Sequence, residues 1–279
     1  MKAFISDIHA NKDALKNVLN DIDQHNADEI ICLGDIVGYG PDPVACTDMV
    51  MERAETTIMG NHDYALLHGA IGFNDIAREA IDFTREIMKC EGSEDDTKLI
   101  SRVCLSCLEK DECPKCFDME SSGKEHWEFL ENLPAHQRES NLLYVHGSPL
   151  DPTFEYVMPD VFSRFDPKNI RDMFTEVDRL AFCGHTHYPC AVDSDIVFHY
   201  PQVDGLTITL NPEKKYIINI GSVGQPRDRD NRSSYVLFDE KEMTVEWRRI
   251  EYDIQSVADR ISSMCGLNNW CGERLLLGR

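Results

Sequence analysis

Two histidines stand one residue apart in the stretch FCGHTHYP, residues 182–189, directly after the apolar run RLAFC. If this stretch is extended, alternate side chains share one face, so His185 and His187 would point the same way, roughly 7 Å apart along the strand. The beginning of the chain repeats the pattern, because the apolar run at residues 2–6 leads into Asp7 and His9. Carboxylate and imidazole are metal-binding groups, so the first chemistry that the sequence suggests is metal binding.

Three further polar clusters follow apolar runs along the chain. They are LGDIVGYG with Asp35, MGNHDY with Asn61, His62 and Asp63, and VHGSP with His146. Each cluster alone is a weak signal, because a single histidine at a strand end is more often a core or capping group, and GD or GN is usually only a turn. Together with the two pairs, they supply carboxylate, amide oxygen and imidazole without a cysteine, which is the ligand mix of Mn, Fe or Zn.

Helices and strands, which must position these residues, alternate in the first part of the chain. Helical spacing of apolar residues predicts helices at 12–25, 43–54 and 75–89, and short apolar runs predict strands at 2–6, 28–34 and 55–60. Such alternation is typical of α/β folds, which place their sites beyond the carboxyl ends of the strands.

The second half of the chain is rich in strands. Short β-rich runs separated by turn residues predict strands at 141–147, 179–185, 205–210, 215–221, 233–239 and 244–250. Helices are predicted at 125–133 and at 253–264, and the second of these is expected to close the chain. We expect residues 1–279 to form one domain.

An insertion interrupts this pattern at residues 91 to about 123, which are acidic and lack clean periodicity. It contains CLSCLEKDECPKC, in which two C-x-x-C pairs are formed by Cys104, Cys107, Cys113 and Cys116. Four thiolates at this spacing suit a structural zinc ion or an iron–sulfur cluster, and free thiols or a reversible disulfide are the third interpretation. The spacing leaves these alternatives open.

Composition limits the partners. The chain has 28 Lys and Arg against 50 Asp and Glu, a formal net charge of −22, which repels nucleic-acid backbones and anionic membranes. A small anionic substrate can still bind if divalent cations supply positive charge locally. No signal peptide or 18-residue apolar run is present, so we expect a cytoplasmic protein with reduced cysteines, among which Cys32 and Cys183 are core thiols. The oligomeric state stays open.

The five clusters in their order along the chain, D-x-H, G-D-x-x-G, G-N-H-D, H and G-H-x-H, are similar to the motifs of the calcineurin-like metallophosphoesterases. The stretch IGSVGQPRDRDNRSSYVLFD and the ending ERLLLGR further resemble the bacterial phosphodiesterase branch, which is related to the diadenosine tetraphosphatase-like enzymes. The resemblance implies a four-layer αββα sandwich with two divalent transition-metal ions at the strand ends.

The resemblance also implies a role for each motif residue. One ion would be held by Asp7, His9, Asp35 and His187, and the other by Asp35, Asn61, His146 and His185. Asp35 would bridge the two ions, and a hydroxide held between them would attack the phosphorus of a small phosphoester. His62 would stabilise or protonate the departing oxygen, with Asp63 orienting its ring.

The motifs do not identify the substrate. A phosphodiesterase or phosphatase is the leading hypothesis, and a dinucleoside polyphosphate hydrolase or a protein phosphatase of the same superfamily is the alternative. A non-catalytic interaction scaffold is less favoured, because such members tend to lose ligands and this chain keeps all seven.

Two further features bear on substrate binding. Arg227, Arg229 and Arg232 could hold a second phosphate, but Asp228 and Asp230 interleave with them, so a solvated loop is an equal alternative. Tyr39 could stack on a base or simply pack within its loop.

Overall fold

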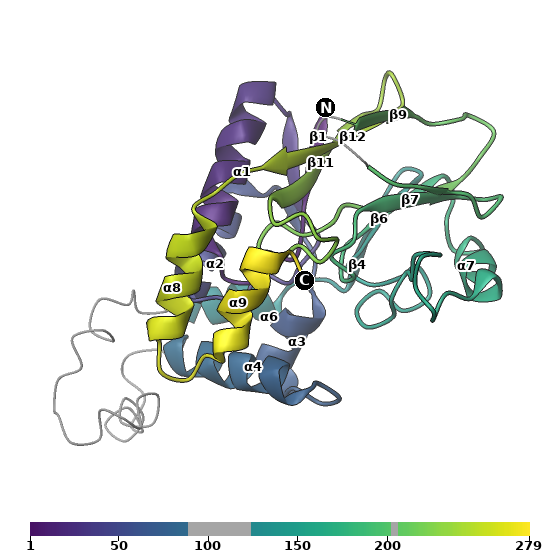
Figure 1. Ribbon diagram of the computed structural model, residues 1–279. Helices are drawn as coiled ribbons and strands as arrows, with labels where there is room; N and C mark the ends of the chain where they lie inside the picture. The colour runs from purple at the N-terminus through teal and green to yellow at the C-terminus, as the bar shows by residue number, and fades with distance from the viewer. Residues whose placement is uncertain (89–123, 202–205) are drawn as a thin grey trace, which may run out of the picture.

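The computed structural model describes residues 1–88, 124–201 and 206–279, and within them the chain forms two six-stranded β-sheets that face each other (Figure 1). The first sheet has the order β3-β2-β1-β11-β12-β9 and contains β1 (Lys2–Ile5), β2 (Glu29–Cys32), β3 (Thr56–Thr57), β9 (Leu206–Thr209), β11 (Ser233–Asp239) and β12 (Thr244–Ile250). The second has the order β4-β5-β6-β10-β7-β8 and contains β4 (His136–Glu139), β5 (Leu142–Val145), β6 (Leu180–Cys183), β7 (Cys190–Asp193), β8 (Phe198–His199) and β10 (Tyr216–Asn219).

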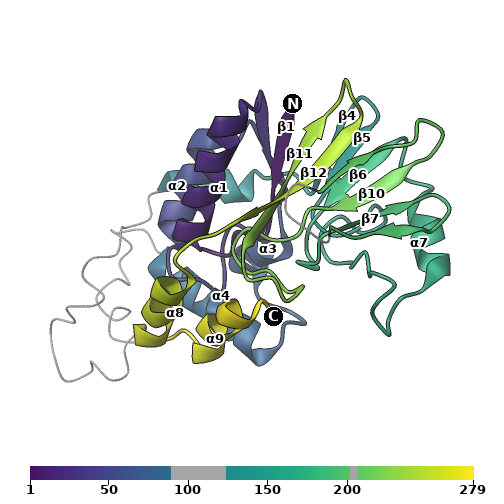
Figure 2. The ribbon, with the colours of Figure 1, turned by 45° about the horizontal axis from the view of Figure 1, so that its top comes forward.

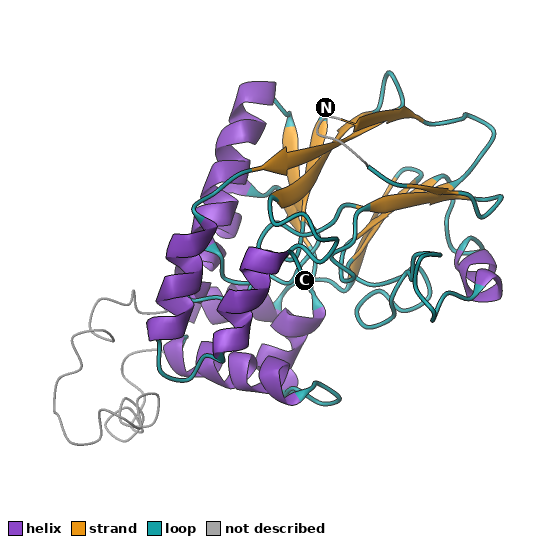
Figure 3. Ribbon diagram, in the orientation of Figure 1, coloured by secondary structure: helices purple, strands orange, loops and turns teal. Residues whose placement is uncertain are grey.

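Helices cover the two outer faces, as Figures 2 and 3 show. The first sheet is covered by α1 (Lys12–His25), α2 (Pro43–Arg53), α3 (Asn61–His68), α4 (Asp75–Ile87), α6 (Lys124–Glu131), α8 (Ile254–Ser263) and α9 (Asn269–Leu277). The outer face of the second sheet packs against α7 (Pro167–Met173). The order of layers is helix, sheet, sheet, helix, so the predicted αββα sandwich is confirmed.

Successive side chains of β1 point to opposite faces of the sheet, so this strand contributes to two hydrophobic cores. Ala3 and Ile5 face the helices, whereas Phe4 faces the other sheet. There Phe4 stacks on Phe182 of β6, with ring centroids 3.9 Å apart and planes 6° apart. Trp247 of β12 also crosses the seam, because its indole Nε1 donates to the Asn219 carbonyl at 3.0 Å. Buried aromatic contacts therefore hold the two sheets together.

Local sequence accounts for the first helix. Asn11 caps α1 by accepting a hydrogen bond from the Ala14 amide at 3.1 Å, and Asn26 ends the helix with a left-handed φ of 51°. The apolar face that the sequence predicted is buried, and it consists of Ala14, Leu15, Val18, Leu19 and Ile22. This helix packs against β11 and β12 on the outer face of the first sheet, and its first residues follow the polar cluster at the end of β1.

The strands that lead into the polar clusters run parallel to one another within each sheet. In the first sheet β1 pairs with β2 and β2 with β3, and in the second β5 pairs with β6 and β6 with β10, all in parallel. Their carboxyl ends therefore lie at one edge of each sheet, where sites of α/β folds are found.

The sequence missed several elements, namely α3, α7, α9, β4, β7 and β8. The prediction that the helix at 253–264 closes the chain is wrong, because α9 follows it. Gly272 weakens the helical signal of α9, yet a Cβ at this position would approach the Ala258 carbonyl of α8 to 2.9 Å. Glycine is required there because the two helices pack closely.

The described cysteines are free thiols, and Cys32 and Cys183 are fully buried as predicted. Burial raises the pKa of both thiols, so they stay protonated. The four cysteines of the predicted insertion, Cys104, Cys107, Cys113 and Cys116, lie outside the described residues. Among the helices that are described, none is long and apolar enough to span a membrane.

Candidate active site

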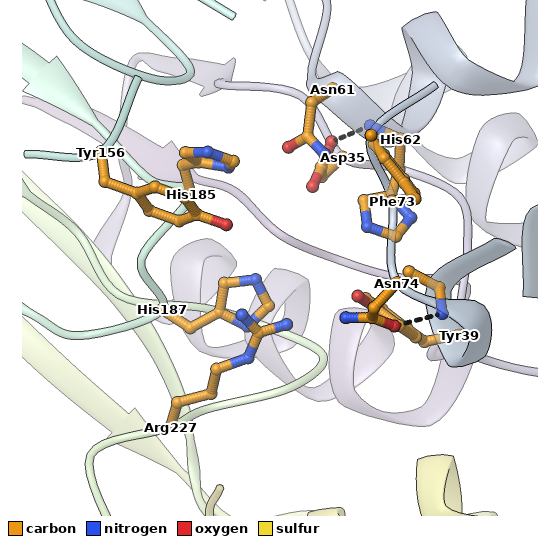
Figure 4. A pocket seen from close by; sticks show the side chains of 12 residues that line it. Asp35, Tyr39, Asn61, His62, Phe73, Asn74, Tyr156, His185, His187 and Arg227 are labelled. Atoms are coloured by element: carbon orange, nitrogen blue, oxygen red, sulfur yellow. Dashed lines mark hydrogen bonds between the residues drawn. The ribbon is translucent and has the colours of Figure 1, made fainter. Parts of the chain in front are cut away.

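The structure brings together all seven side chains that the resemblance assigns to metal binding. Asp7 and His9 follow β1, Asp35 follows β2, Asn61 begins α3, His146 follows β5, and His185 and His187 follow β6. All seven are buried. Figure 4 shows Asp35, Asn61, His185 and His187 around one pocket, with His62 at its side.

The backbone that presents these residues is not extended, so the expected strand geometry is wrong. β1 ends at Ile5 and β6 at Cys183, before the polar residues begin. Five of the seven residues have left-handed φ angles between 49° and 66°, and they are Asp7, His9, Asp35, His185 and His187. Such conformations are costly for residues other than glycine and cluster at functional sites. Tight turns, and not a shared strand face, direct these side chains into the pocket.

Two motif glycines make room for these turns. Gly38 has a φ of 88°, and a Cβ there would collide with the His62 ring. A Cβ at Gly184 would collide with the Asp7 carboxylate and with Ser6. The close approach at Gly184 joins the end of β6 to the end of β1, and the His185 amide donates to Asp7 Oδ2 at 3.0 Å.

The first group of donor atoms consists of Asp7, His9 and His187. His187 Nε2 lies 3.1 Å from both Asp7 Oδ1 and His9 Nε2, and the latter lies 3.7 Å from Asp35 Oδ2. The three donors of this group therefore converge on a space the size of one ion, and Asp35 lies beside them through its contact with His9.

The second group consists of Asp35, His146 and His185, with Asn61 beside them. His146 Nε2 lies 3.4 Å from Asp35 Oδ2 and 3.0 Å from Asn61 Oδ1. Asp35 Oδ2 thus faces His9 of the first group and His146 of the second, which is the position that a bridging carboxylate needs.

Main-chain carbonyls fix the orientation of all four imidazoles. Nδ1 faces Val37 O at 3.1 Å in His9, Leu33 O at 2.9 Å in His146 and Gln225 O at 2.5 Å in His187. His185 is reversed, because its Nε2 faces Phe154 O at 3.1 Å. A carbonyl only accepts, so the nitrogen facing it carries the proton, and the other nitrogen presents a lone pair to the site.

This arrangement fits a cation. With Nδ1 protonated in both rings, neutral His9 and His187 direct two Nε2 lone pairs at each other across 3.1 Å. Burial lowers the pKa of both rings, so neither readily gains a second proton to bridge the gap. A positive ion beside the two nitrogens removes the repulsion, and the ligand types suit Mn, Fe or Zn.

The carboxylates of the site are ionised. Burial alone would raise their pKa values, but the surrounding imidazoles, His187 for Asp7 and His146 for Asp35, hold them well below the usual range. Burial likewise opposes the charge on His146, yet the Asp35 and Asp7 carboxylates raise its pKa to about 9. The carboxylates thus favour a positive charge at this position, and a bound cation would take the place of the second proton on His146.

His62 lies outside the seven, although donor atoms of His62, His9 and Asp35 lie within 4.8 Å of one another. Its ring packs against Tyr39, His9 and Phe73, with centroid distances of 4.5, 4.8 and 4.9 Å. Burial lowers its pKa to about 4, so the ring is neutral near pH 7, and Nδ1 has no hydrogen-bond partner. Its main-chain amide donates to Asp35 Oδ1 at 2.7 Å, which ties it to the bridging carboxylate.

The contacts of Asp63 differ from those expected. Its carboxylate does not contact the His62 ring but accepts from four main-chain amides, those of Asp35 at 2.8 Å, Ile36 at 3.0 Å, Val37 at 3.3 Å and Gly60 at 3.0 Å. Asp63 therefore shapes the turn that carries Asp35, and the expectation that it orients the His62 ring is wrong.

The pocket also contains residues that the motifs did not identify. It encloses about 450 Å³ including its mouth, and Phe73, Asn74, Tyr156 and Arg227 contribute to its lining. Tyr156 stacks on His185, with centroids 3.9 Å apart. The sequence held no local signal for Tyr156 or Phe73, because loops from distant parts of the chain place them.

Tyr39 and Asn219 have supporting roles. Tyr39 is 7 % exposed and packs against His9 and His62, so it is a packed loop aromatic. Asn219, at the end of β10, donates to Gly184 O at 2.5 Å and to Thr186 Oγ1 at 3.0 Å. It thereby supports the turn that carries His185 and His187.

The αββα sandwich with clustered carboxylates and imidazoles at its strand ends defines a metallophosphoesterase-type protein. A family model, the calcineurin-like phosphoesterase superfamily domain, matches residues 1–243. The chain is 32% identical to a metallophosphoesterase from Sphaerobacter thermophilus whose crystal structure superposes with a TM-score of 0.77, covering 100% of this chain and 98% of that one. The chain belongs to the calcineurin-like phosphoesterase superfamily.

Two archaeal proteins are similar over the full length. The uncharacterized protein MJ0912 of Methanocaldococcus jannaschii is 35% identical, covering 100% of this chain and 98% of its own. The hypothetical protein PH1004 of Pyrococcus horikoshii is 18% identical with a TM-score of 0.69, covering 100% of this chain and 99% of that one, and it shares the fold.

Proposed function

We propose that this protein is a metal-dependent hydrolase of a small phosphoester, with two divalent ions held by the seven clustered side chains. The first ion would bind to Asp7, His9, Asp35 and His187, and the second to Asp35, Asn61, His146 and His185. The observation that carries the proposal is the pair of imidazole lone pairs of His9 and His187, which face each other at 3.1 Å in a buried site.

Two divalent ions in such a site supply a nucleophile at neutral pH and neutralise the charge of the phosphoryl oxygens. The chain's own residues orient the reaction. Asp35 Oδ2 lies between the two donor groups, 3.7 Å from His9 Nε2 and 3.4 Å from His146 Nε2. The main-chain carbonyls fix each imidazole so that its other ring nitrogen points into the site. Burial of the site removes competing water, which strengthens each electrostatic contact.

His62 is proposed to assist the departing oxygen. Its ring lines the pocket, and Nδ1 is buried without a partner. A neutral imidazole has one N–H to donate, so it can stabilise negative charge on an oxygen that leaves the phosphorus. Because the ring is not among the seven proposed ligands, its removal should spare metal binding.

The pocket supports a small substrate more than an extended one. Its cavity volume is about 130 Å³, and the net charge of −22 disfavours a long polynucleotide. The scaffold alternative is disfavoured, because all seven donors are present and five of them adopt left-handed backbone conformations, which are costly and cluster at functional sites. A cytoplasmic location remains a prediction from the sequence.

The proposal is tested with purified protein and added Mn. Hydrolysis of bis-p-nitrophenyl phosphate, p-nitrophenyl phosphate, cyclic nucleotides and diadenosine tetraphosphate is measured alongside the metal content of the protein. We expect turnover of at least one of these phosphoesters and close to two metal equivalents per chain. Absence of both metal and turnover would contradict the proposal, and bound metal without turnover would favour the scaffold alternative.

A further inference from the structure

Arg227 extends into the pocket from the loop that follows β10 (Figure 4). Its main-chain amide donates to His187 O at 3.2 Å, which anchors the residue next to the first donor group. Its Nη2 donates to Gln225 Oε1 at 2.8 Å, whereas Nε is buried without any hydrogen-bond partner. Part of the guanidinium is therefore unsatisfied at the wall of the pocket.

The acidic residues of the same loop do not neutralise Arg227. Asp228 pairs with Arg249, and Asp230 pairs with Arg232 at 2.6 Å. Among the residues that the structure describes, no carboxylate forms an ion pair with Arg227. The charge cancellation that the alternating sequence suggested does not occur at this position, and the positive charge of Arg227 faces the pocket.

A second arginine lies close by. The guanidinium carbon of Arg274, on α9, is 5.8 Å from the centroid of the Tyr39 ring, and that of Arg227 is 5.9 Å from the same centroid. The Arg274 Nε donates to the main-chain oxygen of Arg279 at 2.5 Å. Burial, together with the charge of Arg227, lowers the pKa of Arg274 to about 10. Arg274 does not line the pocket, so it adds to the positive potential there only through its charge, and Arg227 is the residue that an anion in the pocket would contact.

The reacting phosphate has another source of positive charge. Two divalent ions, if bound at the proposed centre, would neutralise its oxygens. In a chain with a net charge of −22, a half-buried arginine without a carboxylate partner beside that centre points to a second anion. Arginine suits this task because its planar fork matches phosphate oxygens.

We propose that Arg227, supported by Arg274, binds a second phosphate of the substrate, so that the preferred substrate is a phosphoester with another phosphate next to the one that reacts. This inference rests on the proposed function. Nucleoside polyphosphates and inorganic polyphosphates both contain adjacent phosphates, and ADP and pyrophosphate distinguish the two classes.

The test compares ligands that differ by one phosphate. Binding of AMP, ADP, orthophosphate and pyrophosphate to the Mn-loaded protein is measured by calorimetry with Mn in excess. We expect each two-phosphate ligand to bind about 10- to 100-fold more tightly than its one-phosphate counterpart, the range of a hydrogen bond to a charged group. A gain for ADP alone would identify a nucleoside polyphosphate, and equal gains would identify the phosphate chain itself. Equal binding of one- and two-phosphate ligands would overturn the inference.

Arg227→Gln provides the matched variant, and Arg229→Gln is its control, because Arg229 lies exposed on the same loop and does not line the pocket. Arg227→Gln should abolish the preference for two phosphates, whereas Arg229→Gln should keep both the preference and the turnover. Diadenosine tetraphosphate turnover should fall by a larger factor in Arg227→Gln than bis-p-nitrophenyl phosphate turnover. An equal fall for both substrates would place Arg227 on the reacting phosphate and contradict the inference.

The two proposals fail in different ways. If no phosphoester is hydrolysed, the proposed function fails, and the calorimetric preference still tests the anion site by itself. If phosphoesters are hydrolysed but Arg227→Gln leaves the preference intact, only the anion site is wrong. Thermal unfolding of each variant shows whether a loss reflects misfolding.

Discussion

The two sheets contribute different chemistry to the site. The first sheet supplies both carboxylates, Asp7 and Asp35, together with His9 from the end of β1. The second sheet supplies three imidazoles, His146, His185 and His187, from the ends of β5 and β6. The carboxylates are thus concentrated on one side of the seam, and three of the four imidazoles lie on the other.

This difference shows that neither sheet contains a complete site. Each proposed ion takes ligands from both sheets, so only their closure creates the two groups of donors. The aromatic contact between Phe4 and Phe182 lies in that seam and holds the sheets in register. Stability of the sandwich and geometry of the site therefore depend on the same packing.

The largest effect is expected from Asp35→Asn, on the carboxylate side. Asp35 Oδ2 faces both donor groups, so its neutralisation should remove both metal equivalents and nearly all turnover. His187→Gln, on the imidazole side, should remove only one equivalent, because His187 contacts a single group. Metal analysis of the two variants checks this difference.

The control for both variants is Asp172→Asn, an exposed aspartate on α7, which should keep metal and turnover. Equal metal loss in Asp35→Asn and His187→Gln would mean that Asp35 does not bridge the two sites.

A smaller loss is expected for His62→Ala, which removes a pocket residue outside the seven proposed ligands. Turnover should fall by about 10²- to 10⁴-fold, the usual contribution of a general acid, with the metal content unchanged. Steady-state kinetics and metal analysis on one preparation provide the measurement. Loss of metal together with turnover would show that His62 is a ligand.

The seam itself is tested by Phe182→Ala. Removing this buried ring, which stacks on Phe4, should lower the free energy of unfolding by about 3 to 5 kcal/mol. Phe182→Leu keeps most of the volume and should cost less than about 1.5 kcal/mol. Denaturant unfolding measures both. Equal stability of the two variants would mean that volume in the seam is unimportant.

The smallest effect is expected for Asn219→Ala. This change leaves the Gly184 carbonyl without its side-chain donor, so the free energy of unfolding should fall by about 1 to 3 kcal/mol. Because the turn carries His185 and His187, metal affinity should fall with stability. Asn141→Ala, at an exposed position, serves as control. Unchanged metal affinity in Asn219→Ala would show that the hydrogen bonds of Asn219 do not position the metal ligands of this turn.

Much of the architecture could be predicted from local patterns. The helices at 12–25 and 43–54 and the strands at 2–6 and 28–34 have clear periodicity, and the structure contains them within a residue or two. The strand predicted at 55–60 is shorter, because β3 covers only Thr56–Thr57. Elements with weak local signals were missed. In α9, Gly272 counts against a helix locally but is required by the contact with α8, which lies outside any sequence window.

The sequence alone determined which residue types occur in which order, and their resemblance to the calcineurin-like motifs implied the αββα class, the superfamily and the seven candidate ligands. The tertiary structure decided how they meet. His9 and His187 are 178 residues apart, yet their nitrogens lie 3.1 Å from each other because two strand ends close on a shared seam. Within the first sheet, the turn after β2 meets the start of α3, so that the Asp63 carboxylate accepts from main-chain amides. In the loop after β10, Asp228 and Asp230 pair with Arg249 and Arg232 and not with Arg227. Such contacts depend on distances between segments far apart in the chain, which residue type and spacing do not encode.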